Sequence, residues 1–167
     1  IPNTDHPGRI KGIVANFTNI KELKNAVIAF QESENQLQLI MDLMPALISY
    51  VDTDFRYIRV NKVYEEWFDV AVQDVIGRTV RENIGEIVWK MAAPGLERAR
   101  NGELVSYEQF VTYENEVSRW TAKNYIPVKD ESGAVKGIII HISDISERKA
   151  TEQALVEKEN ALRFIMD

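Results

Sequence analysis

Alternating apolar and polar residues constrain the fold of this chain more than any other feature. Five short runs of this kind predict strands, at residues 46–51, 55–60, 104–113, 119–128 and 135–143. The segment between the second and third runs predicts helices, with Asn61 capping the first and Pro94-Gly95 interrupting the last. Two strands, then helices, then three strands predict an α+β fold. We expect a five-stranded antiparallel sheet with helices on one face and long amphipathic helices at either end.

The chain also repeats part of itself. Residues 8–42 align with residues 133–167 without a gap, and 15 of these 35 positions are identical. A repeat of this length predicts tandem copies of one structural unit, joined by helices. We therefore expect four parts: the terminal strand of a preceding copy at 1–19, a linker helix at 20–44, a complete domain at 45–144 and a C-terminal signalling helix at 145–167.

Both predicted linker helices carry apolar residues at spacings of three and four. Each begins with a capping side chain and a Glu three residues later, Asn19 with Glu22 and Asp144 with Glu147. The pattern predicts a parallel coiled coil between two copies of the chain, and it would equally suit a helix that packs on its own domain. The seam in the first helix, which one polar residue interrupts, consists of Leu23, Val27, Phe30, Glu34, Leu37 and Met41.

Composition argues against several classes of protein. The 167 residues include no cysteine and only two histidines, His6 and His141, which leaves little for a metal site or a nucleophilic triad. The net charge is −6 and no basic cluster is present, which argues against nucleic-acid binding. No apolar run is long enough to span a membrane, so we expect no membrane insertion and a cytoplasmic location.

Particular residues, in this order of elements, resemble a Per-Arnt-Sim (PAS) domain. The string Tyr57 to Phe68 resembles the second strand and first helix of that family, and Val75 to Thr79 resembles its mid-domain turn. Trp120 to Asp130 resembles its fourth strand. Asp144 to Lys149 resembles its closing Asp-Ile-Thr motif, with Ser146 in place of threonine. The likeness extends over about residues 38–150, and residues 8–24 resemble the end of a preceding copy.

The resemblance implies a sensory and signal-relay module that is not itself an enzyme. Its implied partners are a second copy of the chain and an effector domain on the same polypeptide, such as a histidine kinase of a two-component system or a cyclic-dinucleotide synthase. The expected relay residues are Asp144, Ile145 and Ser146, where the last strand passes into a helix. The alternative is a structural dimerisation spacer without a ligand. An isomerase or dehydratase would need an acid–base pair of Asp, His or Tyr in the pocket, and the predicted pocket offers Tyr107, Tyr125 and Lys123 with no carboxylate.

The resemblance also implies a small pocket inside the sheet. By comparison with flavin-binding members, one set of alternate strand residues faces it, although the opposite face, with Trp120, Ala122 and Ile126, is as apolar and is assigned to the first linker helix. The implied pocket residues are Tyr107, Gln109, Val111, Thr121, Lys123, Tyr125, Ile138, Ile140 and Ile142 from the strands, with Trp67, Trp89 and Met91 from the helices.

Lys123 is the most informative of these residues, because an ammonium inside a pocket needs a partner. A ligand carboxylate or phosphate would serve, and so would a glutamate or solvent. No cofactor is predicted. The absence of cysteine argues against a cysteinyl-flavin adduct, and the absence of histidine from the mid-domain helix argues against haem.

Overall fold

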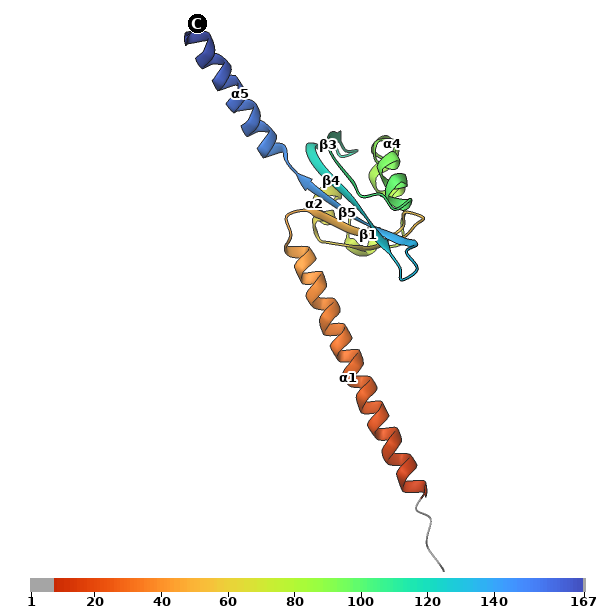
Figure 1. Ribbon diagram of the computed structural model, residues 1–167. Coiled ribbons are helices and arrows are strands. Elements are labelled where there is room, and N and C mark those ends of the chain that lie inside the picture. Colours follow the sequence, from red (N-terminus) through yellow and green to blue (C-terminus); the bar gives the residue numbers. More distant parts are fainter. Residues whose placement is uncertain (1–7, 167) are drawn as a thin grey trace, which may run out of the picture. The chain divides into compact units, whose positions relative to one another are not determined.

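The computed structural model describes residues 8–166 of the chain (Figure 1). Two compact units make up the chain, Ile1–Ile40 and Met41–Asp167, and each is considered by itself. None of the described helices is long and apolar enough to cross a membrane.

The first unit consists of most of helix α1 (Gly8–Leu43). The strand expected for residues 1–19 is wrong over residues 8–19, which are helical, and residues 1–7 lie outside the described part. The helix start expected at Asn19 is wrong for the same reason. A strand without a neighbour leaves its backbone groups unpaired, whereas a helix pairs them within the segment. The division into copies of one repeat stays a prediction.

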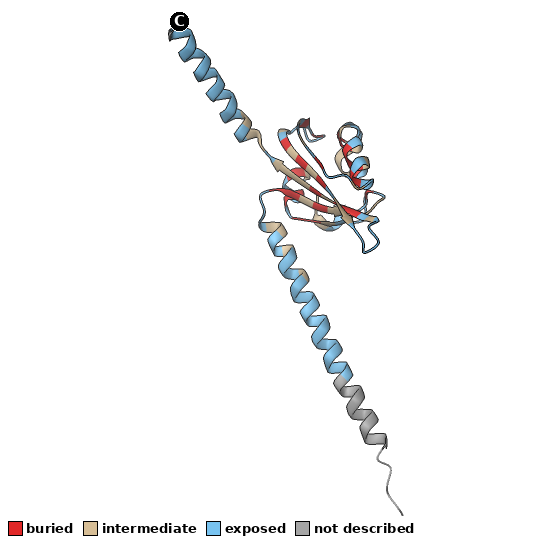
Figure 2. Cartoon of the chain, viewed as in Figure 1, coloured by how far each residue is buried: buried red, intermediate tan, exposed pale blue. Residues whose placement is uncertain are grey.

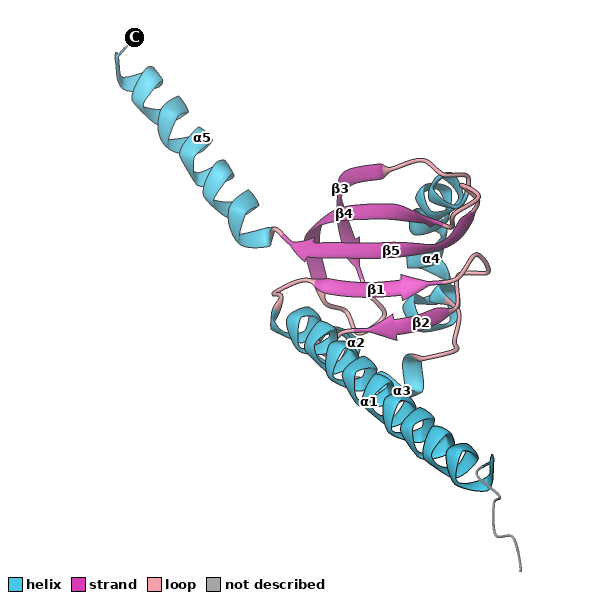
Figure 3. Cartoon of the chain, turned by 60° about the horizontal axis from the view of Figure 1, so that its bottom comes forward, coloured by secondary structure: helices cyan, strands magenta, loops and turns pink. Residues whose placement is uncertain are grey.

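The second unit is built on a five-stranded antiparallel sheet, as the alternation predicted. The strand order is β2-β1-β5-β4-β3, so the first and last strands in sequence lie side by side at its centre (Figure 3). The strands are β1 (Leu47–Val51), β2 (Tyr57–Val60), β3 (Val105–Thr112), β4 (Ser118–Lys129) and β5 (Val135–Asp144).

Three helices follow β2, and the longest of them covers the inner face of the sheet (Figure 3). They are α2 (Val63–Phe68), α3 (Val72–Val75) and α4 (Val80–Arg100). The interruption expected at Pro94-Gly95 is wrong. The chain leaves helical geometry at Gly85 instead, where φ is 77° and ψ is 167°. This left-handed φ is one that glycine adopts without a Cβ penalty. Gly95 has another role, since a Cβ there would lie 2.7 Å from the Tyr125 ring.

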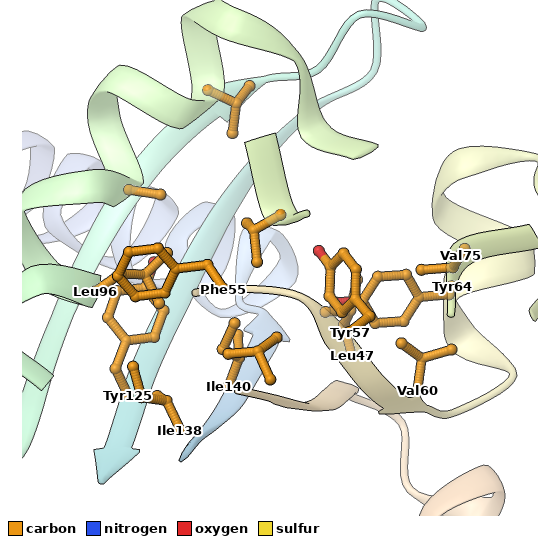
Figure 4. Packing of buried hydrophobic residues seen from close by; sticks show 14 of the residues in the cluster. Leu47, Phe55, Tyr57, Val60, Tyr64, Val75, Leu96, Tyr125, Ile138 and Ile140 are labelled. Carbon is orange, nitrogen blue, oxygen red and sulfur yellow. The ribbon is translucent and has the colours of Figure 1, made fainter. Parts of the chain in front are cut away.

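The core lies between the inner face of the sheet and the helices (Figure 2). Tyr57 and Tyr64 approach each other edge to face, with ring centroids 5.4 Å apart, and lie beside Leu47 (Figure 4). Tyr125 and Leu96 lie farther along the same layer, with Ile140 between the two groups. The last strand leads into helix α5 (Ser146–Met166).

The sequence predicted that Asn61 caps α2, but its side chain makes no capping hydrogen bond to that helix. The residue is fully buried, and its amide instead connects three backbone positions. Its Oδ1 accepts from the Ile48 N–H at 3.0 Å, and its Nδ2 donates to the carbonyls of Ala46 at 2.7 Å and Met41 at 2.9 Å. The side chain thus holds the end of β2 against the segment that enters β1.

Candidate functional site: an inner cavity connected to the last helix

Alternate residues of three strands line the inner face of the sheet. On β4, Thr121, Lys123 and Tyr125 are buried while their neighbours are more exposed. Val111 on β3 and Ile138 and Ile140 on β5 are also buried. The partly buried Tyr107, Gln109 and Ile142 belong to the same alternating sets. These are the alternate residues that the resemblance assigned to the pocket; that they bind a ligand stays a prediction.

A small cavity lies between this face and the helices. About 30 Å³ of it is open to the centre of a water molecule, which is room for a small ligand only. Its lining is mostly apolar and aromatic: Leu47, Tyr57, Tyr64, Phe68, Val80, Ile84, Val88, Ala92, Leu96, Tyr113, Lys123, Tyr125, Ile140 and Ile142.

The expected helical wall residues lie outside this lining. Trp67 packs edge to face on Tyr113, and Trp89 packs on Phe55, while Met91 is a partly buried member of the core. The α4 residues that do reach the cavity are Val80, Ile84, Val88, Ala92 and Leu96, at spacings of four. That spacing could have indicated a buried face. Which helical face meets the sheet depends on the break at Gly85, and the sequence pattern predicted an interruption at Pro94-Gly95 instead.

Among the described residues that line the cavity, Lys123 is the one with a positive charge, and the residue is only 2% exposed. Its Nζ donates to Oε1 of Gln109 at 3.0 Å and lies 5.6 Å from the centroid of the Tyr107 ring. Within the described part of the chain, no carboxylate lies within ion-pair distance of this ammonium, and no Asp or Glu lines the cavity. Burial lowers the pKa of Lys123 from 10.5 to about 8.

The tyrosines of the cavity stay neutral over the physiological range. Burial raises the pKa of Tyr57 to about 12 and that of Tyr64 well above its ordinary value. The Tyr64 hydroxyl donates to Oγ of Ser49 at 3.0 Å. Burial likewise raises the pKa of Tyr125, whose hydroxyl accepts from the Tyr107 hydroxyl at 3.2 Å. These groups therefore act as hydrogen-bonding hydroxyls and not as anionic partners for Lys123.

Four hydrogen bonds hold the junction between β5 and α5, and three of them join it to β4. Asp144 accepts from Arg119 at 2.6 Å and from the Ser146 backbone N–H at 2.9 Å. Two hydrogen bonds join Trp120 to the start of α5. The Ile145 N–H donates to the Trp120 carbonyl at 2.8 Å, and the Trp120 N–H donates to Oγ of Ser146 at 3.0 Å. The three expected relay residues therefore all contact the neighbouring strand.

The charges at this junction are matched. Burial alone would raise the pKa of Asp144, but the hydrogen bonds from Ser146 and the ion pair with Arg119 outweigh it and lower that pKa. Glu108 on β3 accepts from Lys149 and Arg148 in the first turns of α5, which lowers the pKa of its carboxyl. The Lys149 ammonium also lies 5.3 Å from the Trp120 ring centroid.

A continuous set of contacts runs from the cavity to this junction. Tyr113 lines the cavity and packs edge to face on Trp67, with centroids 5.9 Å apart. The Arg119 guanidinium lies 4.6 Å from the centroid of Trp67 and also donates to Asp144. Trp67 and Arg119 are the functional candidates that connect the two regions. The family resemblance implied that Trp67 lines the pocket wall, and no sequence pattern indicated a role for Arg119.

This sheet order, with helices over an inner cavity and a helix anchored where the last strand ends, defines a sensory domain of the PAS type. The family profile for the PAS fold matches residues 41–150, well over half of the chain, and the chain belongs to that family. No curated protein matches its sequence.

Solved structures show the same fold at low sequence identity. The PAS domain of Bordetella pertussis BvgS is 24% identical, with a TM-score of 0.59 over 78% of this chain and 98% of that one. An RNA-binding light-oxygen-voltage receptor is 20% identical, with a TM-score of 0.58, and the match covers 76% of this chain but 37% of the receptor. The PAS domain of histidine kinase ThkA is 22% identical, with a TM-score of 0.50 over 60% of this chain and all of that one.

Proposed function

We propose that this chain is a signal-relay PAS module in which a change at the inner cavity alters helix α5. The observation that carries the proposal is the double contact of Arg119, which lies over Trp67 in the core and pairs with Asp144 at the helix start. A shift of Tyr113 at the cavity would move Trp67, and the Arg119–Asp144 pair would pass that shift to α5. The module would have no catalytic activity of its own.

The partners we propose are a second copy of the chain and an effector domain on the same polypeptide. The seam of α1 supports the homodimer, because Phe30 is 66% exposed and Leu23, Val27 and Leu37 are also exposed within the single chain. A large apolar side chain gains free energy when a partner helix removes it from water. The fold shared with the PAS domain of a histidine kinase supports an effector of the histidine kinase class. A cyclic-dinucleotide synthase is the other class of effector that we propose.

The alternative is a dimerisation spacer that carries no signal. The same exposed seam on α1 favours it, since a spacer needs only that helix. The two functions differ at the junction. In a relay, the cavity and α5 are energetically coupled, whereas in a spacer they are independent.

Coupling between the cavity and α5 is expected to depend on Asp144. Replacing Tyr113 by leucine should change amide hydrogen exchange in the first turns of α5 by about 10-fold, because it removes the ring that packs on Trp67. The same replacement in an Asp144→Asn background should leave exchange in α5 as it is in Asp144→Asn alone. Hydrogen-exchange mass spectrometry on the full chain gives both values.

Asp130→Asn is the matched control for Asp144→Asn. Asp130 also accepts hydrogen bonds from backbone N–H groups two and four residues ahead, but in the turn between β4 and β5. Coupling should survive in that background. Equal effects of Tyr113→Leu in all backgrounds, or none in any, would leave the spacer as the function.

Dimerisation through α1 predicts a second result. Phe30→Glu should raise the dimer dissociation constant by more than about 10-fold, because a charge at a seam position is desolvated on association. Ile28→Glu is the control, since Ile28 is 52% exposed and lies off the seam. Sedimentation equilibrium of the two variants measures the difference. A similar loss in both, or in neither, would place the interface elsewhere.

A further inference from the structure

We infer that the inner cavity binds a short-chain monocarboxylate, with its carboxylate on Lys123 and its aliphatic tail against the apolar wall. The inference rests on the proposed relay function and names the class of ligand that would act at the cavity. Three features carry it: the unpaired charge of Lys123, the size of the cavity and the chemistry of its lining.

The charge of Lys123 calls for an anion. Its ammonium carries three N–H donors, and the neutral amide oxygen of Gln109 accepts one of them. A buried charge without an opposite charge is destabilising, and the described residues bring no carboxylate to it. A bound carboxylate would supply the opposite charge and two acceptor oxygens. The amide of Gln109 also carries N–H donors that suit the second oxygen.

The cavity limits this anion in size and charge. About 30 Å³ open to the centre of a water molecule suits a ligand of a few non-hydrogen atoms and excludes a flavin or a nucleotide unless the walls move. One lysine offers one positive charge, which matches a carboxylate better than a phosphate dianion. The rest of the lining is mostly apolar and includes the aliphatic side chains of Val88, Ala92, Leu96 and Ile140, which favours a short hydrocarbon tail over a polar one.

Near pH 8, the titration of Lys123 itself should control the pH dependence of carboxylate binding, because its neighbours do not titrate there. Tyr107 and Tyr125 are its titratable neighbours on β3 and β4, and burial raises the pKa of both. Helix α4 contributes no charged residue to the lining; Arg98, near its end, acts on Tyr107 and is paired with Glu103. Binding of a carboxylate should therefore weaken as Lys123 loses its proton.

The test is calorimetric or NMR titration of the full chain with sodium acetate, propionate and butyrate, against sodium chloride at constant ionic strength. Saturable binding of at least one carboxylate is expected. Lys123→Met should weaken it by about 10- to 100-fold, the size of a lost charge-assisted hydrogen bond. Lys129→Met, which removes an exposed lysine from the same strand, should leave it unchanged. Above pH 8 the affinity of the wild-type chain should fall about 10-fold per pH unit.

Two results would overturn the inference: no saturable binding of any of the three carboxylates, or binding that Lys123→Met leaves intact. Preferential binding of inorganic phosphate would overturn the carboxylate assignment as well. These failures are separable from failure of the relay. If carboxylates do not bind but Tyr113 and α5 remain coupled through Asp144, the relay stands without this ligand. If they bind and that coupling is absent, the cavity is a binding site without an output through Asp144.

Discussion

Asn61→Ala is expected to lower the free energy of unfolding of the PAS domain by about 3 kcal/mol and its Tm by about 10 °C. The buried amide makes three hydrogen bonds, to Ile48, Ala46 and Met41, and alanine leaves all three backbone groups without that partner. The cost is large because Asn61 is fully buried, its bond to Ala46 is buried and its bonds to Ile48 and Met41 are partly buried. Urea and thermal unfolding of the full chain, followed by circular dichroism, measure it.

Asn124→Ala is the control for this prediction. Asn124 lies on the outer face of β4, where its Oδ1 accepts from Oγ of Ser106 in an exposed hydrogen bond. Water can replace that bond, so the loss should stay below about 1 kcal/mol. Equal, small losses in the two variants would mean that water also reaches the site of Asn61 and that the buried amide is not what joins β1 to β2.

Lys123→Met is expected to stabilise the domain by about 2 kcal/mol at pH 7. The fall in the pKa of Lys123 from 10.5 to about 8 corresponds to about 3 kcal/mol of unfavourable burial of the charged form. Methionine has a similar shape and no charge, and the lost hydrogen bond to Gln109 offsets about 1 kcal/mol. Urea unfolding of both chains at pH 7 gives the difference.

The pH dependence of stability checks the same cause independently. Between pH 8 and 10.5 the unfolded chain holds the lysine proton more tightly than the folded one, so wild-type stability rises with pH in that window. At pH 9.5 the gain over pH 7 should be about 2 kcal/mol relative to Lys123→Met, which lacks this proton. Measurements should stop near pH 9.5, because burial raises the pKa of Tyr64 and Tyr125, and ionisation of unfolded tyrosines then opposes folding.

A parallel pH dependence in the two chains, or a loss of stability in Lys123→Met, would show that the ammonium is well accommodated without a ligand. If Lys123→Met instead raises the free energy of unfolding, that result would be typical of a residue retained for function at a cost in stability. The stability measurement and the carboxylate titration therefore examine the same side chain by independent means.

Local features of the sequence were enough to predict most of the domain. Alternation predicted all five strands, because successive side chains on a strand point to opposite faces and only one face of this sheet is buried. The Asp144-Ile145-Ser146 motif predicted the junction, because an Asp that bonds the backbone ahead of it acts over two residues. The family resemblance indicated which alternate residues face inward, a choice that alternation alone left open.

Features that depend on residues distant in sequence were not predictable in this way. Asparagine is a residue type typical of helix caps, but the partners of Asn61 lie in β1 and just before it, and only the folded chain brings them together. The helical wall of the cavity depends on the break at Gly85, whereas the sequence pointed to Pro94. The first 12 described residues of α1 had the pattern of a strand, yet without a neighbouring strand the helix satisfies their backbone.

The sequence by itself therefore determined the order of the elements, the α+β class and the residues at the strand-to-helix junction, because local periodicity and short-range hydrogen bonds encode them. Only the tertiary structure decided that Lys123 is buried with no carboxylate of the described residues beside it and that Arg119 joins Trp67 to Asp144. Those properties depend on which side chains the sheet and helices bring within a few ångströms of one another. The side chains come from segments that lie far apart in the sequence, so local sequence patterns do not encode their contacts.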